Sequence, residues 1–191
     1  LTIEKRNVTL TSATDSKEYD GTPLTNGTVT VSGDGFAEGE GATYNVTGSQ
    51  TIVGSSDNEF TYELNDGTNE ANYDITTKFG TLTITNRDAK YEITVVAKSD
   101  TVTYDGTKKS VSGFETLEFV VNDQKYKVEG LSAEATGTDA GEYDAEVTGT
   151  AVVKDAAGNV VTDQFSVKTQ NGTLTIEKRN VTLTSATDSK E

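Results

Sequence analysis

Apolar and polar residues alternate one by one along most of this chain. In a β-strand, successive side chains point to opposite faces, so this period of two places one face on a core and the other in water. Thr, Val, Ile and Tyr, which favour strands, fill the alternating stretches, and Gly, Asn and Asp separate them. The pattern predicts an all-β protein with little helix. The clearest alternating stretches are residues 7–11, 27–32, 60–64, 82–84, 91–95 and 101–104.

A long exact repeat indicates how the chain is organised. Residues 1–18 and residues 174–191 both read LTIEKRNVTLTSATDSKE. Chance does not produce an identity of this length and complexity. We therefore interpret the chain as part of an array of near-identical units with a period of 173 residues (174 − 1), and an engineered overlap is the alternative.

Each repeat unit itself contains two related halves. The sequence GTLTI occurs at 80–84 and again at 172–176, and the sequence YDGT occurs at 19–22 and again at 104–107. The order and spacing of these two motifs are similar in both halves. We therefore predict two homologous domains that differ by small insertions.

Placing the domain boundaries at the LTI sequences predicts four segments. Residues 1–5 are the end of the last strand of a preceding repeat, 6–85 are domain A, 86–177 are domain B, and 178–191 are the first strand of the next domain A. Because the joins are short, we expect an elongated, semi-rigid array. A first strand without its own sheet should need a partner to become ordered.

An immunoglobulin-like β-sandwich is the fold that we favour for each domain, with a β-grasp-like sheet as the alternative. The segment Asp139–Tyr143, which reads DAGEY, resembles the turn of immunoglobulin-like sandwiches in which a Tyr hydroxyl bonds to upstream backbone. The resemblance implies a hydrogen bond from the Tyr143 hydroxyl to a nearby carbonyl oxygen.

Composition narrows the range of functions. The chain has no Cys and no His, which removes thiol nucleophiles, disulfides, thiolate metal sites and the commonest general base. No carboxylate pair stands out, so we predict no catalytic residues, no cofactor and no metal site. The 31 acidic residues against 16 Lys and Arg, a net charge of −15, argue against nucleic acid as a partner.

The chain lacks an apolar stretch of membrane-spanning length, so no membrane span is expected in this segment. It also lacks Met, and we expect it to be a segment of a longer protein. The absence of Cys fits a Gram-positive surface protein.

The two YDGT sequences are typical of a tight turn after a strand. The Tyr should point inward, the Asp should accept hydrogen bonds from the next residues along the chain, and the Gly should adopt a positive φ. We favour this structural interpretation over a Tyr–Asp ligand site. The predicted turn residues are Tyr19, Asp20, Gly21, Tyr104, Asp105 and Gly106.

Two further clusters have a structural and a functional interpretation. The loop 34–40, GDGFAEGEG with its flanks, could offer carboxylates to calcium, but it lacks an alternating D-x-D-x-D-G pattern, so a solvated loop anchored by Phe36 is favoured. Lys90 or Lys98 could form a covalent crosslink to Asn171, although ordinary solvated lysines are favoured.

The sequences of residues 18–33, 53–75 and 79–84 resemble the MBG and YDG repeat domains of large bacterial cell-surface proteins and adhesins. Domain A matches along most of its length, and domain B keeps YDGT and GTLTI. The resemblance implies an extracellular setting, at the cell surface or anchored to the cell wall, with identical repeats as neighbours in the chain, and it brings no catalytic residues.

The sequence leaves two functions open, and neither is enzymatic. The first is a stalk that projects a distal binding region from the cell wall. The second is a module in which each repeat binds a host glycan, mucin or matrix protein, strengthened by avidity. If the first and last strands of a domain pair in parallel, a pull on the array shears their hydrogen bonds together, which suits the stalk.

Overall fold

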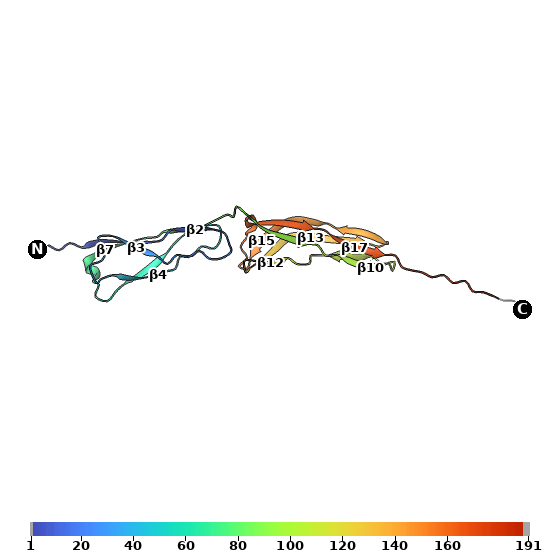
Figure 1. Cartoon of the computed structure of the whole chain (residues 1–191), viewed down its shortest axis with the longest axis horizontal. Coiled ribbons are helices and arrows are strands. Elements are labelled where there is room, and N and C mark those ends of the chain that lie inside the picture. Colours follow the sequence, from blue (N-terminus) through green and yellow to red (C-terminus); the bar gives the residue numbers. More distant parts are fainter. Residues whose placement is uncertain (1, 189–191) are drawn as a thin grey trace. The chain divides into compact units, whose positions relative to one another are not determined.

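A computed structural model describes residues 2–188, in which one compact unit ends at Lys90 and the next begins at Tyr91 (Figure 1). Both units are all-β, as the alternation predicts. Within 2–188 the helical segments are two three-residue 3-10 helices, η1 (Glu70–Asn72) and η2 (Thr162–Gln164). A β-grasp-like fold packs a helix on its sheet, and this part of the chain offers no such helix. None of it forms a helix long and apolar enough to cross a bilayer.

Domain A contains eight strands. They form the sheets β3-β1-β7, β2-β8-β5 and β4-β6. The strands are β1 (Arg6–Ser12), β2 (Asp15–Glu18), β3 (Val29–Gly33), β4 (Ala42–Val46), β5 (Gly54–Asp57), β6 (Phe60–Leu64), β7 (Tyr73–Lys78) and β8 (Thr81–Thr85).

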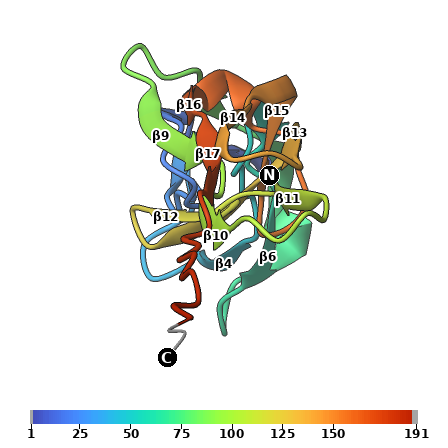
Figure 2. The ribbon, with the colours of Figure 1, turned by 90° about the vertical axis from the view of Figure 1, so that its right-hand side faces the viewer.

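Domain B contains nine strands, and Figure 2 shows β9 beside β16 and β17 beside β14. Its sheets are β10-β17-β14, β16-β9 and a set in which β13 pairs with β11, β12 and β15. The strands are β9 (Tyr91–Val96), β10 (Asp100–Thr103), β11 (Lys109–Ser112), β12 (Glu118–Val121), β13 (Gln124–Gly137), β14 (Gly141–Ala145), β15 (Val147–Asp155), β16 (Phe165–Gln170) and β17 (Gly172–Glu177).

The first and last strand segments of domain A run side by side in the same direction. β1 pairs in parallel with β7, with Arg6 opposite Tyr73, and β2 pairs in parallel with β8, with Asp15 opposite Leu82. Both pairs share one register, because the partners differ by 67 residues in each (73 − 6 and 82 − 15). The two pairs therefore form one interrupted parallel ladder between 6–18 and 73–85.

Domain B repeats this arrangement. β9 pairs in parallel with β16, with Tyr91 opposite Phe165, and β10 pairs in parallel with β17, with Asp100 opposite Leu174. The partners differ by 74 residues in both pairs (165 − 91 and 174 − 100). The parallel pairing of first and last strands, which the sequence raised only as a condition, is thus present in both domains.

The Gly of each GTLTI sequence lies at the interruption of this ladder, where two backbones cross closely. A Cβ on Gly80 would lie closer than 3.0 Å to the carbonyl oxygen of Ala13, and one on Gly172 would lie equally close to that of Lys98. Neither Gly has a positive φ, so close approach rather than backbone conformation requires glycine at both positions.

Side chains from facing sheets fill the core of domain A. Val8 and Leu10 from β1 are almost completely buried and pack with Phe60 of β6 and Tyr73 of β7. Since β1-β7 and β4-β6 belong to separate sheets, the cluster lies between two layers, as in a β-sandwich. The immunoglobulin-like topology in detail stays a prediction.

In domain B, the cluster of Ala135, Ala145, Leu174 and Ile176 has the partly buried Tyr143 packed against it. The hydroxyl of Tyr143 donates to the carbonyl oxygen of Asp139 at 3.0 Å. The hydrogen bond predicted from the DAGEY sequence is confirmed.

Gly80→Ala should lower the stability of domain A by about 2 kcal/mol, because the added methyl group forces two backbone segments apart. Scanning calorimetry of the whole chain measures this as a shift of the domain A transition. Gly172→Ala, which should lower the other transition, assigns the two.

Gly27→Ala is the matched control, since a Cβ there meets nothing within 4 Å. It should change stability by no more than about 0.5 kcal/mol. Equal effects of Gly27→Ala and Gly80→Ala would contradict the close crossing.

Candidate functional site

The turn after β2 is held by the Asp20 carboxylate. Its Oδ1 atom accepts hydrogen bonds from the backbone N–H of Thr22 at 2.8 Å and from the Thr22 hydroxyl at 2.7 Å. Gly21 has φ 82°, and the Lys17 ammonium lies 2.9 Å from Asp20. The predicted Asx turn is confirmed.

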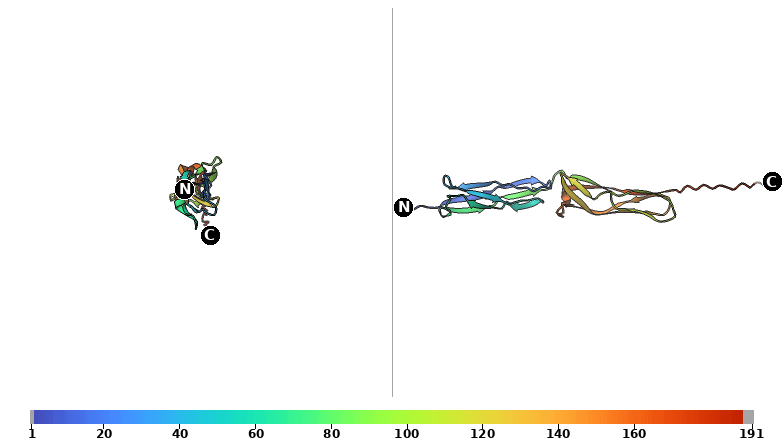
Figure 3. Two further views of the ribbon diagram at one scale, coloured as in Figure 1. Left: turned by 90° about the vertical axis from the view of Figure 1, so that its left-hand side faces the viewer. Right: turned by 90° about the horizontal axis from the view of Figure 1, so that it is seen from below.

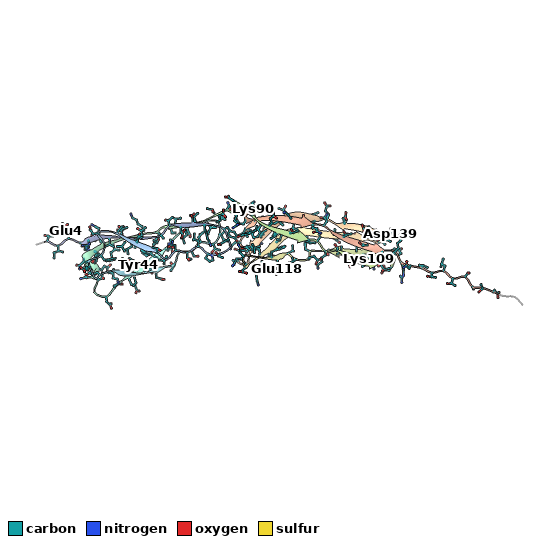
Figure 4. All side chains as sticks on the ribbon, viewed as in Figure 1. Glu4, Tyr44, Lys90, Lys109, Glu118 and Asp139 are labelled. Carbon is teal, nitrogen blue, oxygen red and sulfur yellow. The ribbon has the colours of Figure 1, made fainter. Side chains whose placement is uncertain are left out.

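The turn after β10 has the same geometry in domain B. Asp105 Oδ1 accepts from the Thr107 backbone N–H at 2.9 Å and from the Thr107 hydroxyl at 2.6 Å, and Gly106 has φ 81°. The cation differs in position, because Lys109, which lies after the turn, approaches Asp105 to 2.6 Å. Figure 4 shows Lys109 at the end of domain B at which β17 ends.

The hydrogen bonds and cations lower the pKa of both carboxyl groups. For Asp20, partial burial by itself would raise the pKa, but the hydrogen bonds from Lys17 and Thr22 outweigh it. For Asp105, the hydrogen bond from Lys109 is the largest cause, followed by those from Thr107. Each carboxylate therefore serves its own turn and stays ionised at neutral pH.

The predicted inward position of the Tyr is confirmed for Tyr19 and wrong for Tyr104. Tyr19 is 1% exposed, and its carbonyl oxygen accepts a hydrogen bond from the Arg87 guanidinium at 3.0 Å. Tyr104 is 37% exposed and borders a shallow groove that it shares with Asp139 and Arg179. The motif therefore sets the turn in both domains, but it does not by itself set the burial of the Tyr ring.

Hydrogen bonds from Arg6 of β1 and Tyr73 of β7 hold the acidic loop 34–40 against the rest of domain A. The Arg6 guanidinium donates to the carbonyl oxygens of Asp34 and Gly35, and the Tyr73 hydroxyl donates to the Glu40 carboxylate. Phe36 packs edge-on against Tyr73 with ring centroids 5.1 Å apart, so it is a core anchor, as predicted.

Within residues 2–188, no group of three or more acidic side chains is arranged to hold a metal ion. The Asp34 carboxylate accepts a hydrogen bond from the backbone N–H of Asn7, and the Glu40 carboxylate accepts one from the Tyr73 hydroxyl. Neither carboxylate is grouped with Glu38 in a way that could hold a metal ion, so the calcium interpretation gains no geometric support.

Asn171, Lys90 and Lys98, the residues considered for a covalent crosslink, are engaged in other contacts or face water. Asn171 Oδ1 accepts a hydrogen bond from the Val147 backbone N–H at 3.0 Å, and Lys98 and Lys90 are exposed. Lys98 meets the last strand through its backbone, at the Gly172 crossing. This arrangement leaves the lysine side chains in water.

A buried polar pair distinguishes domain A and was not predicted from the sequence. Asn58 is fully buried, and its Nδ2 donates to the carbonyl oxygens of Ala13 and Asn26 at 3.0 and 2.9 Å. The Ser12 hydroxyl donates to the backbone carbonyl of Asn58 at 2.5 Å and accepts from the N–H of Gly80. These bonds fasten three loops to the interrupted ladder.

The strand registers place Ala97 and Ala145 of domain B where domain A has Ser12 and Asn58. Both alanines are buried, at 1%. The one sequence signal that could have revealed this polar pair is an alignment of the two halves on GTLTI and YDGT, which would place Ser12 opposite an alanine.

Comparisons of the chain with protein-family models, with curated proteins and with solved structures found no match. The function therefore has to be argued from the geometry of the two domains.

Asp105→Asn should destabilise domain B at neutral pH, because it removes the ion pair with Lys109. The folded-state pKa of Asp105 lies below its ordinary value of 3.8, so its contribution is fully present above that pH and is lost as the pH falls below it. The difference between wild type and variant should therefore narrow below pH 3.8, measured by thermal melts over a pH series.

Asp144→Asn is the control for charge alone, because Asp144 is exposed on β14 and its side chain makes no hydrogen bond or ion pair within residues 2–188. It should leave the domain B transition nearly unchanged at neutral pH. A deficit for Asp105→Asn that stays constant down to pH 2 would contradict the electrostatic origin.

Proposed function

We propose that this chain is a structural spacer from a bacterial cell-surface adhesin, made of two MBG/YDG-type repeat domains. In this role it belongs to an extracellular, wall-anchored array that holds a distal binding region away from a Gram-positive cell. The proposal needs no catalytic group, cofactor or metal.

The observation that carries the proposal is the parallel ladder between the first and last strand segments of each domain. In a parallel pair, the start of the first strand and the end of the last strand lie at opposite ends of the ladder. Tension along the chain therefore acts along the strands and loads the ladder hydrogen bonds of 6–18 with 73–85 together. The same holds for 91–103 with 165–177 in domain B.

A domain that must transmit tension gains from this geometry. Antiparallel terminal strands that are pulled from one end separate one hydrogen bond at a time, whereas a sheared parallel pair must break many together. Both domains have the shear arrangement although their cores differ, which supports transmission of force as their common role.

Binding of a host glycan or protein by each repeat is the second candidate. One groove in domain B favours it, lined by Phe119, Val120, Lys125 and Tyr126, with Val120 66% exposed. An apolar residue left exposed in a groove is a feature of contact surfaces. A glycan and mucin array probed with the whole chain and with Val120→Asp distinguishes the two functions, because a spacer gives no Val120-dependent binding.

Single-molecule pulling on the whole chain by its ends should give two separate unfolding peaks, because each ladder resists shear. An extended chain gains about 3.5 Å per residue, so domain B, from Tyr91 to Glu177, should give a contour increment roughly 25 Å longer than domain A, from Arg6 to Thr85. Repeated unfolding and refolding of one molecule measures both increments.

A flexible polypeptide of the same length provides the control trace. Extension of the chain at low force without peaks would contradict the spacer proposal.

A further inference from the structure

The dipeptide Asn–Gly occurs twice in the chain, at 26–27 and at 171–172. One copy lies in each domain (Figure 3, where domain A is coloured blue to green and domain B green to red). An Asn side chain followed by Gly is open to attack by the backbone nitrogen of that Gly, because a glycine has no Cβ to obstruct the approach. The two copies therefore present the same reactive group in two different surroundings.

In domain A, the surroundings leave the Asn26–Gly27 pair free to react. The pair lies in the irregular stretch 25–28, where Gly27 is exposed and its N–H makes no hydrogen bond within residues 2–188. The Thr28 N–H donates to Asn26 Oδ1 at 3.1 Å across Gly27, which keeps the side-chain amide next to the Gly27 peptide. The same N–H stabilises the negative charge that develops on Oδ1 when Cγ is attacked.

In domain B, the strand ladder holds the matching pair in place. Gly172 is buried in β17, opposite Ala145, and a Cβ on it would lie closer than 3.0 Å to the Lys98 carbonyl oxygen. The Asn171 Oδ1 atom accepts a hydrogen bond from the Val147 N–H at 3.0 Å, which holds the amide toward β15. A ring closed on the Gly172 nitrogen would pull Gly172 out of the ladder, so the folded domain opposes it.

We propose that Asn26 is a site of spontaneous deamidation and that Asn171 is protected from it. The Gly27 nitrogen bonds to Asn26 Cγ, the Cγ–Nδ2 bond breaks, and the Gly27 amide proton passes through water to the departing nitrogen, which leaves as ammonia. Water then opens the resulting succinimide ring at either carbonyl and gives Asp or isoaspartate at position 26. This modification goes beyond the spacer role, because it depends on the chemistry of one loop and not on tension.

The modified residue should weaken domain A, because Asn26 is bonded on two sides. Its Nδ2 donates to the Asp15 carboxylate at 3.1 Å, so a carboxylate in its place puts two negative charges together. Its backbone carbonyl oxygen accepts from Nδ2 of the buried Asn58 at 2.9 Å. Isoaspartate routes the main chain through Cβ and Cγ and displaces that oxygen, so Asn58 loses a partner in the core.

Incubation of the folded whole chain at mildly alkaline pH, followed by peptide mapping with mass spectrometry, tests the proposal. The peptide that contains Asn26 should gain the mass of a deamidation several-fold faster than the peptide that contains Asn171. In denaturant the two rates should become similar, because the surroundings no longer differ. Calorimetry of the aged folded chain should show a lowered domain A transition and an unchanged domain B transition.

Gly27→Ala is the matched control, since the added methyl group hinders the attack but meets nothing within 4 Å in the fold. It should slow deamidation at Asn26 several-fold and keep the domain A transition in place during ageing. Asn26→Asp, which imposes the new charge at once, should lower that transition without ageing. Equal rates at Asn26 and Asn171 in the folded chain, or a rate at Asn26 that Gly27→Ala leaves unchanged, would overturn the proposal.

Discussion

The parallel ladder between the first and last strand segments is the constraint on which the rest of each domain depends. It joins residues 67 positions apart in domain A and 74 apart in domain B, and it keeps its register across an interruption. That continuity requires a glycine at the crossing, at Gly80 and Gly172. It also sends the chain out of each domain at the end opposite its entry, which is the connectivity that the proposed spacer role requires.

The same backbone arrangement has two different interiors. Domain A fastens its loops with the buried pair Ser12 and Asn58, and domain B has the buried alanines Ala97 and Ala145 in their places. Buried polar side chains stabilise a fold only where the surrounding groups complete their hydrogen bonds. The hydrogen bonds of Ser12 therefore belong to domain A alone, because Ala97, which stands in its place in domain B, has no side-chain hydroxyl.

The sequence predicts features that depend on neighbouring residues and misses those that depend on distant ones. Alternation located some of the strands, such as β1, β6 and β9, and the Asp20 and Asp105 turns were predicted from the chemistry of a few adjacent residues. The partners of the terminal strands are set by long-range packing, which period-two patterning does not encode. Asn58 is buried against Ala13 and Asn26, which are distant in sequence, and Tyr19 and Tyr104 differ in exposure although they stand in the same motif. Neighbouring residues alone were therefore not enough to predict either feature.

Pulling domain A in two directions tests most directly whether the ladder resists force by shear. The chain has no Cys, so paired cysteines introduced at exposed positions provide clean handles. Handles at Glu4 and Asp88 load the ladder lengthwise, whereas handles at Thr25 and Asp88 pull on the neighbouring ends of β2 and β8 and peel the ladder from one end. Shear predicts a several-fold higher unfolding force for the first pair of handles at the same loading rate, and equal forces in the two directions would contradict it.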